Sequence, residues 1–321
     1  MKISVAICTY NGEKYLREQI DSILQQTRKV DEIVVCDDRS SDKTMAILEE
    51  YAEANPNLFR LFINEVNLRS VKNFEKAISL CSGDIIFLSD QDDKWVEEKV
   101  AEYIDYFEKN PTMKAIASNG YCINDDSEIE DKYAIWEVPQ FLAEKGISYD
   151  YYSIINYVSN LATGASMAFK KEIVDAILPF PIVKNFHHDE WIAIVATQSN
   201  AFELLNKKYF YYRTHDSQQV GGVFYDKTDY QKTKLTETFD IHNQNTSFVN
   251  YKIKLKKYIV SYQKNVSLIQ SGTKHNPFLK ENLVVIEGLF EQTKKQMKAQ
   301  YPFLSFLLNI SDKITNKRQL K

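Results

Sequence analysis

The stretch Ile85-Ile86-Phe87-Leu88-Ser89-Asp90-Gln91-Asp92-Asp93 decides the fold of this chain. Its first four residues form a short apolar run, typical of a strand that is buried on both faces, and a polar cluster follows at once. The same order occurs twice earlier, where Thr9-Tyr10-Asn11 follows Ile3 to Cys8 and Asp37-Asp38 follows Glu32 to Cys36. Amphipathic segments of helical spacing separate the runs. The pattern therefore predicts parallel βαβ units whose polar strand ends meet at one rim.

The rest of the chain extends this α/β pattern and then changes character. The other expected elements are strands at 59–63, 114–119, 165–169, 202–205 and 209–213, and helices at 45–52, 71–78, 171–178 and 189–197. Residues 130–160 are rich in tyrosine, and we interpret them as an insertion near the acceptor side. We expect an α/β domain over residues 1–224, joined through Gly221-Gly222 to an α-helical region over residues 225–321.

Composition excludes several classes of protein. With 321 residues, 44% hydrophobic and 26% charged, the chain has an ordinary globular composition. No apolar run approaches the ~20 residues of a spanning helix, and the first run is too short for a signal peptide, so the fold is expected to start at residue one. The four cysteines show no metal-site spacing and are expected to be free thiols in a cytoplasmic protein.

Charge is distributed unevenly along the chain. From residue 225 onward there are 17 Lys and Arg against 8 Asp and Glu, although the whole chain has a net charge of −4. The acidic front argues against a nucleic-acid groove and suits a cation site, and the basic tail could face anionic lipid. We therefore expect no nucleic-acid partner.

The cluster Asp90-Gln91-Asp92-Asp93 is the first candidate site. Three carboxylates at one strand end repel one another unless a cation neutralises them, and such oxygen ligands suit Mg²⁺ or Mn²⁺. The alternative is an acidic cap for a helix that starts near Lys94. Asp38, at the second strand end, could accept a hydrogen bond from a nucleotide base or ribose, and the neighbouring Ser41 and Asp42 are expected to cap the following helix.

In the order and spacing of seven motifs, the chain resembles the family 2 inverting glycosyltransferases of the GT-A fold. The matching stretches are Cys8 to Gly12, Val35 to Thr44, Asn67 to Phe74, Ser89 to Trp95, Thr163 to Met167, His187 to Trp191 and Tyr212 to His215. They cover about 220 residues, and no single one would be specific. Arg39 and Arg69 depart from the pattern, because the family often has glycine at both positions.

The resemblance implies roles for individual residues in donor and metal binding. Asp92 would be the chief metal ligand and His215 would complete the site, with Asp90 directed toward the metal or the ribose. The residues implied to bind the nucleotide-sugar donor are Thr9, Tyr10, Asn11, Asp38, Lys72, Asp90, Gln91 and Arg213. Arg213 would steady the diphosphate, or else pair with an acidic neighbour.

The resemblance also implies a catalytic base. Asp189 would take the proton from the acceptor hydroxyl, with Glu190 as its rival and a helix cap as the alternative role. Residues on the acceptor side would be Trp95, Gly164, Glu190 and Trp191. For Trp95 and Trp191, stacking on sugar and buried packing are equally open.

The form Ser-Asp-Gln-Asp-Asp-x-Trp at Ser89 to Trp95 is most similar to rhamnosyltransferase-like members of the family that build O-antigen, capsule or cell-wall rhamnan. It implies dTDP-L-rhamnose as the donor and a glycan or lipid-linked oligosaccharide as the acceptor. A UDP-hexose or UDP-GlcNAc stays open as the donor. The alternatives from other classes are a nucleotidyltransferase, which lacks support because no glycine-rich phosphate loop follows the first strand, and a catalytically inactive partner subunit.

The basic tail suggests a peripheral contact with the inner face of the plasma membrane. Seven basic residues surround the apolar segment Phe303 to Leu308, namely Lys294, Lys295, Lys298, Lys313, Lys317, Arg318 and Lys321. A self-association helix is the alternative interpretation.

Overall fold

The computed structural model describes residues 1–215, 223–243, 245–315 and 320, with side chains given up to residue 312 and at 320. The chain divides into two compact units. The first comprises Met1–Glu137, Ala162–Phe180 and His187–Asp226, and the second comprises Val138–Leu161, Pro181–Phe186 and Lys227–Lys321. The second unit thus takes two earlier segments in addition to the expected C-terminal region. The expected junction at Gly221-Gly222 lies outside the described residues.

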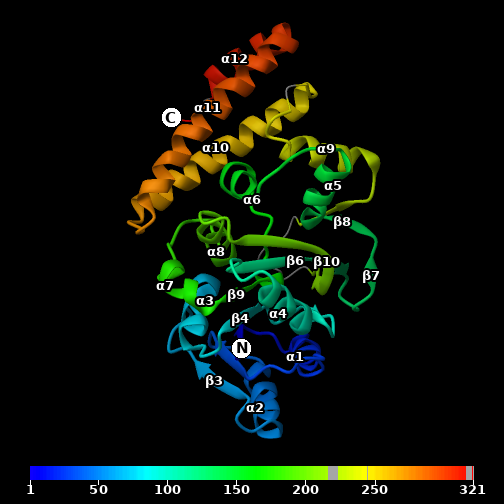
Figure 1. Cartoon of the computed structure of the whole chain (residues 1–321), viewed down its shortest axis with the longest axis vertical. Helices are drawn as coiled ribbons and strands as arrows, with labels where there is room; N and C mark the ends of the chain where they lie inside the picture. Colours follow the sequence, from blue (N-terminus) through cyan, green and yellow to red (C-terminus); the bar gives the residue numbers. More distant parts are fainter. Residues whose placement is uncertain (216–222, 244, 316–319, 321) are drawn as a thin grey trace. The chain divides into compact units, whose positions relative to one another are not determined.

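The first unit alternates strands and helices in its N-terminal half, as predicted (Figure 1). Its strands are β1 (Ile3–Thr9), β2 (Glu32–Asp37), β3 (Phe59–Ile63), β4 (Ile85–Ser89), β5 (Lys94–Trp95), β6 (Ala115–Ile123), β7 (Ile129–Glu130), β8 (Lys132–Ala134), β9 (Ala168–Lys170), β10 (Phe202–Arg213) and β11 (Phe224–Asp226). Its helices are α1 (Leu16–Leu24), α2 (Thr44–Ala54), α3 (Arg69–Leu80), α4 (Lys99–Lys109), α7 (Val174–Ile177) and α8 (His188–Thr197), with short helices η1 (Ile135–Glu137), η3 (Gly164–Ser166) and η4 (Lys171–Ile173).

One mixed sheet in the order β3-β2-β1-β4-β9-β6-β10-β5 forms the centre of this unit, with β7 paired to β6. The pairs β3-β2, β2-β1, β1-β4 and β6-β10 are parallel, whereas β9 runs antiparallel between β4 and β6. Helix α3 packs on β1 and β2 and touches α8, which packs on β6 and β10. The predicted α/β fold, a sheet flanked by helices, is confirmed.

Burial explains why the apolar runs became central strands. All residues of β2 and β4 are buried, and β1 is buried at six of its seven positions. Continuous burial is expected where helices cover both faces of a parallel sheet. The strand order reverses between β1 and β4, and open sheets bind ligands at the carboxyl ends of two such strands. We call this place the crevice.

Two local predictions in this unit were wrong. Residues 202–213 form the single strand β10, with two register shifts against β6, rather than a closing pair of strands. Residues Lys94 and Trp95 form a short strand that pairs with β10, and the next helix begins only at Lys99. The acidic cluster that ends at Asp93 therefore does not cap a helix, which removes the alternative interpretation of that cluster.

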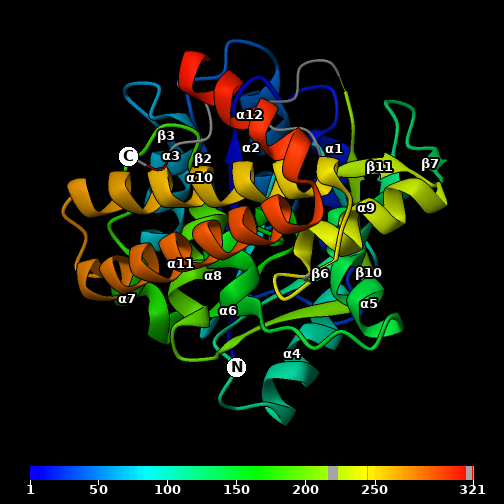
Figure 2. The ribbon, with the colours of Figure 1, turned by 90° about the horizontal axis from the view of Figure 1, so that it is seen from above.

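The second unit is helical and contains α5 (Val138–Glu144), α6 (Tyr151–Ser153), η2 (Ile154–Val158), α9 (Asp229–Phe239), α10 (Phe248–Gln270), α11 (Asn276–Gln300) and α12 (Pro302–Thr315). Helices α10 and α11 lie side by side over most of their length (Figures 1 and 2). Three asparagines form a buried hydrogen-bonded cluster where η2, α10 and α11 meet, namely Asn156 of η2, Asn265 of α10 and Asn282 of α11. Within the described residues, no helix is both long and apolar enough to cross a membrane.

Candidate active site

The turns after β1 and β4 are joined across the crevice by Gln91. Its side-chain oxygen accepts a hydrogen bond from the Tyr10 amide at 2.8 Å, and its side-chain nitrogen donates to the Tyr10 carbonyl at 3.1 Å. A β-carbon at Gly12 would lie 2.3 Å from that oxygen, so the pairing requires glycine there. Gln91 was expected to bind the donor; its side chain holds the backbone of the first turn, and a contact with the donor stays a prediction.

The turn after β2 is tied to the first turn in the same way. The Asn11 side chain accepts a hydrogen bond from the Ser41 amide at 2.8 Å, and the Thr9 hydroxyl donates to the Asp37 carboxylate at 2.7 Å. Thr9 is buried, whereas the Tyr10 side chain is exposed. Of the three residues expected to meet the donor at this turn, Tyr10 and Asn11 are therefore exposed and Thr9 is not.

Asp38 is buried and holds the start of α3. Its carboxylate accepts hydrogen bonds from the amides of Leu68 at 2.6 Å and Arg69 at 2.8 Å, and from the Asn64 side chain at 2.8 Å. Amides at the start of a helix lack partners within the helix, and an acidic side chain there stabilises it. Asp38 thus shapes the second turn, and any contact with a nucleotide would use its remaining lone pairs.

The two arginines that depart from the family pattern both have left-handed backbone conformations, with φ of 66° at Arg39 and 61° at Arg69. Glycine adopts this conformation without steric cost, which explains why glycine is common at both positions. Both arginines are exposed; Arg39 follows Asp38 in the chain, and the Arg69 amide donates to the Asp38 carboxylate. Their positive charges are therefore accessible to an anionic ligand.

The turn after β4 concentrates negative charge in a poorly solvated place. Burial, together with the charges of Asp92 and Asp189, raises the pKa of Asp90 to about 7. Burial and the charges of Asp92 and Asp90 also raise the pKa of Asp93. One Asp93 carboxylate oxygen is buried and has no hydrogen-bond partner among the described residues. This turn is therefore electrostatically incomplete as it stands.

His215 lies directly against Asp92, with 3.0 Å between Nε2 and a carboxylate oxygen. A carboxylate oxygen suits both Mn²⁺ and Mg²⁺, and the imidazole nitrogen beside it favours the transition metal Mn²⁺ of the two. No group of three or more His, Cys, Asp or Glu side chains is placed to hold a metal in the described parts of the chain. The residues therefore fit a cation that takes one or two ligands from the protein and the others from substrate phosphates.

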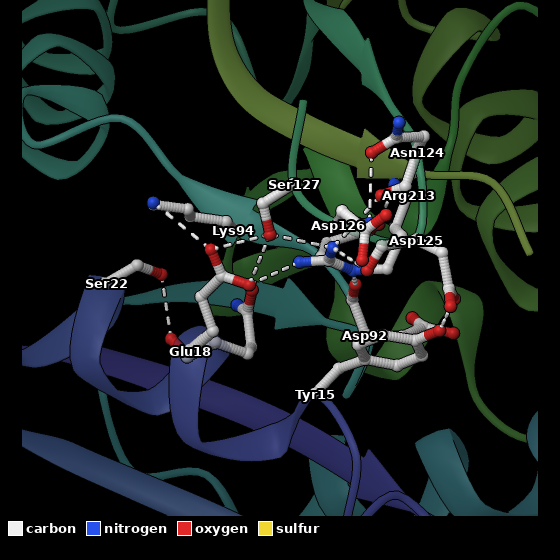
Figure 3. A network of polar contacts seen from close by, with 12 residues as sticks. Tyr15, Glu18, Ser22, Asp92, Lys94, Asn124, Asp125, Asp126, Ser127 and Arg213 are labelled. Atoms are coloured by element: carbon white, nitrogen blue, oxygen red, sulfur yellow. Dashed lines mark hydrogen bonds and ion pairs between the residues drawn. The ribbon is translucent and has the colours of Figure 1, made fainter. Parts of the chain in front are cut away.

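Arg213 is the centre of a polar network under the acidic turn (Figure 3). The guanidinium donates to the backbone carbonyls of Asp92 at 2.8 Å, Asn124 at 3.1 Å and Asp125 at 3.3 Å. It also meets the Glu18 carboxylate at 2.5 Å. Several donors in one fork-shaped group can hold loops from distant parts of the chain in one arrangement.

The donor-binding role expected for Arg213 needs correction. The side chain has no exposed surface, because the carbonyls, Glu18 and the Tyr15 ring enclose it. It therefore cannot reach a donor phosphate as the chain is folded here. The alternative, that Arg213 pairs with an acidic neighbour, is what the structure shows, and its effect on the site passes through the Asp92 backbone.

Asp189 lies at the start of α8, where two amides support its carboxylate. The Gly164 amide donates to it at 3.1 Å and its neighbour Glu190 donates at 2.7 Å. Burial raises the pKa of Asp189 to about 6 in spite of these hydrogen bonds and the nearby His187. A carboxylate with a pKa in this range can exchange protons near neutral pH. Gly164 thus orients the predicted base.

His188, next to Asp189, is a buried residue that the sequence interpretation did not single out. Its ring stacks on Phe74 with 4.0 Å between ring centroids, and burial lowers its pKa to about 3. A β-carbon at Gly164 would lie 2.9 Å from Nε2 of His188. Glycine at position 164 therefore allows both the packing of His188 and the support of Asp189.

The two tryptophans expected on the acceptor side are buried, so that expectation is corrected. Trp95 packs against Phe87, and the Lys99 ammonium lies 4.0 Å from the centroid of its ring. Trp191 donates from its indole nitrogen to the Ile177 carbonyl at 2.9 Å. Buried packing, which was the open alternative, describes both residues. Glu190 is partly exposed beside Asp189.

Lys72 was expected near the base or the phosphates. Its ammonium pairs with Glu75, one turn further along α3, at 2.6 Å, and the side chain is 37% exposed. An exposed pair of this kind contributes little to stability and can exchange partners. Lys72 therefore stays available to an anionic ligand, and its predicted contact stays a prediction.

Sequence reasoning missed two charged residues next to the site, namely Glu18, which pairs with Arg213, and Lys99, which lies near Asp90 and Asp93. Lys99 is fully buried, donates to the Ala165 carbonyl at 2.7 Å, and feels the charges of Asp90 and Asp93. Burial lowers its pKa, and the two carboxylates oppose that effect. Both residues occupy helices whose sequence gives no sign that a charge faces inward.

Comparisons with known proteins agree with this geometry. The model of glycosyl transferase family 2 matches residues 4–178. The chain is 25% identical to the dTDP-rhamnosyl transferase RfbG of Shigella flexneri over 326 residues, which covers 95% of this chain and all of that protein. It spans about a third of the length of several uncharacterized mycobacterial relatives, which are 32% identical over 111 residues.

Solved structures with the same fold carry nucleotide sugars. Staphylococcus aureus TarS 1-349, in complex with UDP-GlcNAc, aligns with a TM-score of 0.55 over 94% of this chain and 92% of its own, at 16% identity. The mannosyltransferase PcManGT of Pyrobaculum calidifontis, in complex with GDP-Man and Mn²⁺, aligns with a TM-score of 0.51 over 98% and 80%, at 15% identity. These likenesses establish the GT-A fold. The crevice between β1 and β4, the acidic turn and the matched family model lead to one conclusion, which is that this chain belongs to glycosyltransferase family 2.

Proposed function

We propose that this glycosyltransferase is metal-dependent and inverting, and that it transfers a sugar from a nucleoside diphosphate to a glycan acceptor. The observation that carries this proposal is the contact of 3.0 Å between His215 and Asp92, at the end of the strand that borders the crevice. Asp92 and His215 follow β4 and β10, which are far apart in the sequence, and they present two ligand atoms side by side. A divalent cation bound there would neutralise the charge that develops on the leaving diphosphate.

Asp189 is the proposed catalytic base. Its carboxylate takes the proton of an acceptor hydroxyl while that oxygen forms a bond to the anomeric carbon, and the bond to the diphosphate oxygen breaks on the opposite face. One such displacement inverts the configuration at the anomeric carbon. The amides of Gly164 and Glu190 hold the carboxylate in place, and the pKa of about 6 keeps it mostly ionised at neutral pH.

The nucleotide would lie over the turns after β1 and β2. Tyr10 is accessible there, and Asp38 and Asn11 fix the backbone to which the base and ribose would bind. The exposed side chains of Arg39, Arg69 and Lys72 would supply positive charge near an anionic donor. Asp90, beside Asp92, would contact the ribose or the cation.

The best-supported donor is dTDP-L-rhamnose. The similarity to the dTDP-rhamnosyl transferase RfbG extends over 95% of this chain, although at 25% identity. A UDP-hexose or UDP-GlcNAc is the alternative donor, because TarS was solved with UDP-GlcNAc and shares the fold. We further propose a lipid-linked oligosaccharide as acceptor, in the synthesis of a bacterial surface polysaccharide such as O-antigen, capsule or cell-wall rhamnan.

A panel of donors tests this proposal. Thermal unfolding and donor hydrolysis are measured with dTDP-rhamnose, UDP-glucose, UDP-galactose and UDP-GlcNAc, each with and without Mn²⁺. We expect stabilisation that depends on Mn²⁺ and is largest for dTDP-rhamnose. Stabilisation by one of the UDP-sugars alone would replace the donor assignment. If no nucleotide stabilises the protein, the whole proposal fails. The alternative of a catalytically inactive partner subunit that binds sugar nucleotides would fail with it.

A further inference from the structure

Helix α12 (Pro302–Thr315), in the second unit, exposes most of its large apolar side chains. Phe303 is 70% exposed and Phe306 is 61% exposed, and Leu304, Leu307 and Ile310 are exposed as well. A helix on the surface of a soluble unit normally buries its apolar face and exposes polar residues. α12 does the reverse.

The orientation of α12 follows from the residue that it buries. Ser305 is 1% exposed, and its hydroxyl donates to the Met297 carbonyl of α11 at 3.1 Å. At about 100° per residue, Phe303, Leu307 and Ile310 fall within roughly 40° of the side opposite Ser305. The helix therefore packs on α11 through a small polar residue and directs Phe303, Leu307 and Ile310 away from α11, with the exposed Leu304 and Phe306 on its flanks.

Lysines occur on the last turns of α11, just before this stripe in the chain, and one of them, Lys294, pairs with the exposed Glu291 at 3.6 Å. Lys295 and Lys298, on the last turns of α11, are exposed, and Lys294 is partly exposed. The acidic residue of α12 among the described side chains is Asp312, which by the same count lies on the side of Ser305 and away from the stripe. The side chains of Lys313, Lys317, Arg318 and Lys321 lie outside the described residues and play no part in this argument.

We propose that the apolar stripe of α12, defined as Phe303, Leu304, Phe306, Leu307 and Ile310, inserts into the surface of an anionic membrane, with the lysines of α11 against the lipid headgroups. Aromatic and aliphatic side chains enter the boundary between headgroups and acyl chains, and nearby lysines are attracted to anionic lipids. The helix has 14 residues. It is therefore too short to span the bilayer but long enough to lie in its surface. This interaction does not depend on the proposed donor, cation or base.

A second copy of the chain fits this surface less well. A helix of 14 residues is about 21 Å long and about 10 Å wide, so one of its faces is a narrow surface. Stable protein interfaces bury about 800 Å² on each partner. Exposed lysines beside the stripe would also face one another in a symmetric dimer, whereas they would be neutralised at an anionic surface.

Flotation of the full chain with vesicles tests the proposal. The vesicles contain phosphatidylcholine, either alone or with roughly one-third phosphatidylglycerol. We expect the protein to float with the anionic vesicles and about tenfold less with the neutral ones, and raised salt should reduce the difference. A protein that stays at the bottom of the gradient with both kinds of vesicle would overturn the proposal.

Matched variants assign the binding to α12. The double variant Phe303→Ser with Phe306→Ser should lower binding to anionic vesicles by about tenfold or more, because the two largest inserted side chains are lost. The control is Val249→Ser with Val260→Ser on α10, two residues with 51% and 53% exposure that lie outside the stripe. It should bind as the wild type does. Equal flotation of both variants would refute the role of the stripe.

Two further measurements separate charge from self-association. Replacing Lys294, Lys295 and Lys298 with Gln should remove the preference for anionic vesicles and keep weak binding to both kinds; an unchanged preference would contradict the headgroup contact. Light scattering of the vesicle-free protein addresses the second copy. The wild type could form a dimer that the double variant Phe303→Ser with Phe306→Ser converts to monomer. If the wild type also fails to bind vesicles, this result would show that α12 binds another chain instead of a membrane.

Discussion

The two sides of the crevice differ in how their polar groups are satisfied. On the side of β1 and β2, hydrogen bonds join Asn11 to the second turn and Asp38 to the start of α3. On the side of β4, the Asp93 carboxylate keeps a buried oxygen without a partner in the described structure, and burial raises the pKa of Asp90 and Asp93. One side is complete without a ligand, and the other is not.

This difference indicates which side of the crevice a bound ligand would stabilise most. A turn whose carboxylates already accept amides is preorganised, so a nucleotide would meet a fixed surface there. A turn with buried, mutually repelling carboxylates is stabilised by whatever positive charge it receives. Lys99 and Arg213 lie close to this turn, and Asp92 and His215 present the ligand atoms that a cation would use.

The largest effect is expected for Asp189→Asn, which tests the acidic side directly. The amide keeps nearly the same shape but cannot take a proton, so transfer should fall by about 10²–10⁴-fold while donor binding is kept. Radiolabelled sugar transfer and nucleotide binding are measured on the same preparation. The control is Glu190→Gln, its neighbour on α8. If Glu190→Gln loses transfer and Asp189→Asn does not, the base is Glu190.

The next effect concerns the buried support of the acidic turn. Arg213→Ala removes the cation that faces Glu18 and leaves three backbone carbonyls without their donor, and it should lower the free energy of unfolding by about 3–5 kcal/mol. Urea unfolding measures it. The matched control is Arg17→Ala on the same helix as Glu18, because the Arg17–Glu50 pair is exposed and its loss should change little. Equal losses in the two variants would mean that the Arg213 network adds nothing special.

A pH profile sharpens the comparison further. The pKa of Asp189 is raised to about 6, so its basic form is lost as the pH falls through that value. We expect kcat/KM to rise tenfold per pH unit below about pH 6 and to level off above it. Rates between about pH 5 and pH 8, measured at saturating Mn²⁺, check this. A profile that is flat across this interval would remove Asp189 from the proton transfer.

The smallest effect is expected on the completed side. Asp38→Asn turns one acceptor oxygen into a donor that faces the amides at the start of α3, and it should cost about 1 kcal/mol of stability. Thermal unfolding without ligand measures the change. Nucleotide affinity should fall only through this distortion of the turn. A large loss of affinity with unchanged stability would instead show that Asp38 contacts the nucleotide directly.

Much of the fold was readable because it depends on local order. The runs before Thr9, Asp37 and Asp90 became β1, β2 and β4, and all four cysteines are free, as predicted. The strand β5 was missed because two residues carry no period, and they pair with β10 more than 110 residues away. The antiparallel insertion of β9 between β4 and β6 likewise depends on tertiary pairing rather than on its own sequence.

The candidate site was readable in its residues and less so in their roles. Asp92 and His215, 123 positions apart, were expected together and lie in contact. Arg213 was expected to face the donor, but its buried guanidinium pairs with the carboxylate of Glu18, which is 195 positions away in the sequence. A sequence motif indicates that a charged residue is needed near a site. Whether that charge faces the ligand or the protein depends on partners that the motif does not contain.

The measurement that most directly tests the central claim is a titration of Mn²⁺ followed by electron paramagnetic resonance, in the presence of dTDP. The account predicts that wild-type protein removes one Mn²⁺ per chain from the free signal. It also predicts that Asp92→Asn and His215→Ala bind the ion at least about tenfold more weakly, because each loses one of the two protein ligands. Wild-type affinity in both variants, or no binding of Mn²⁺ by the wild type, would contradict the claim that the acidic side of the crevice is completed by a cation.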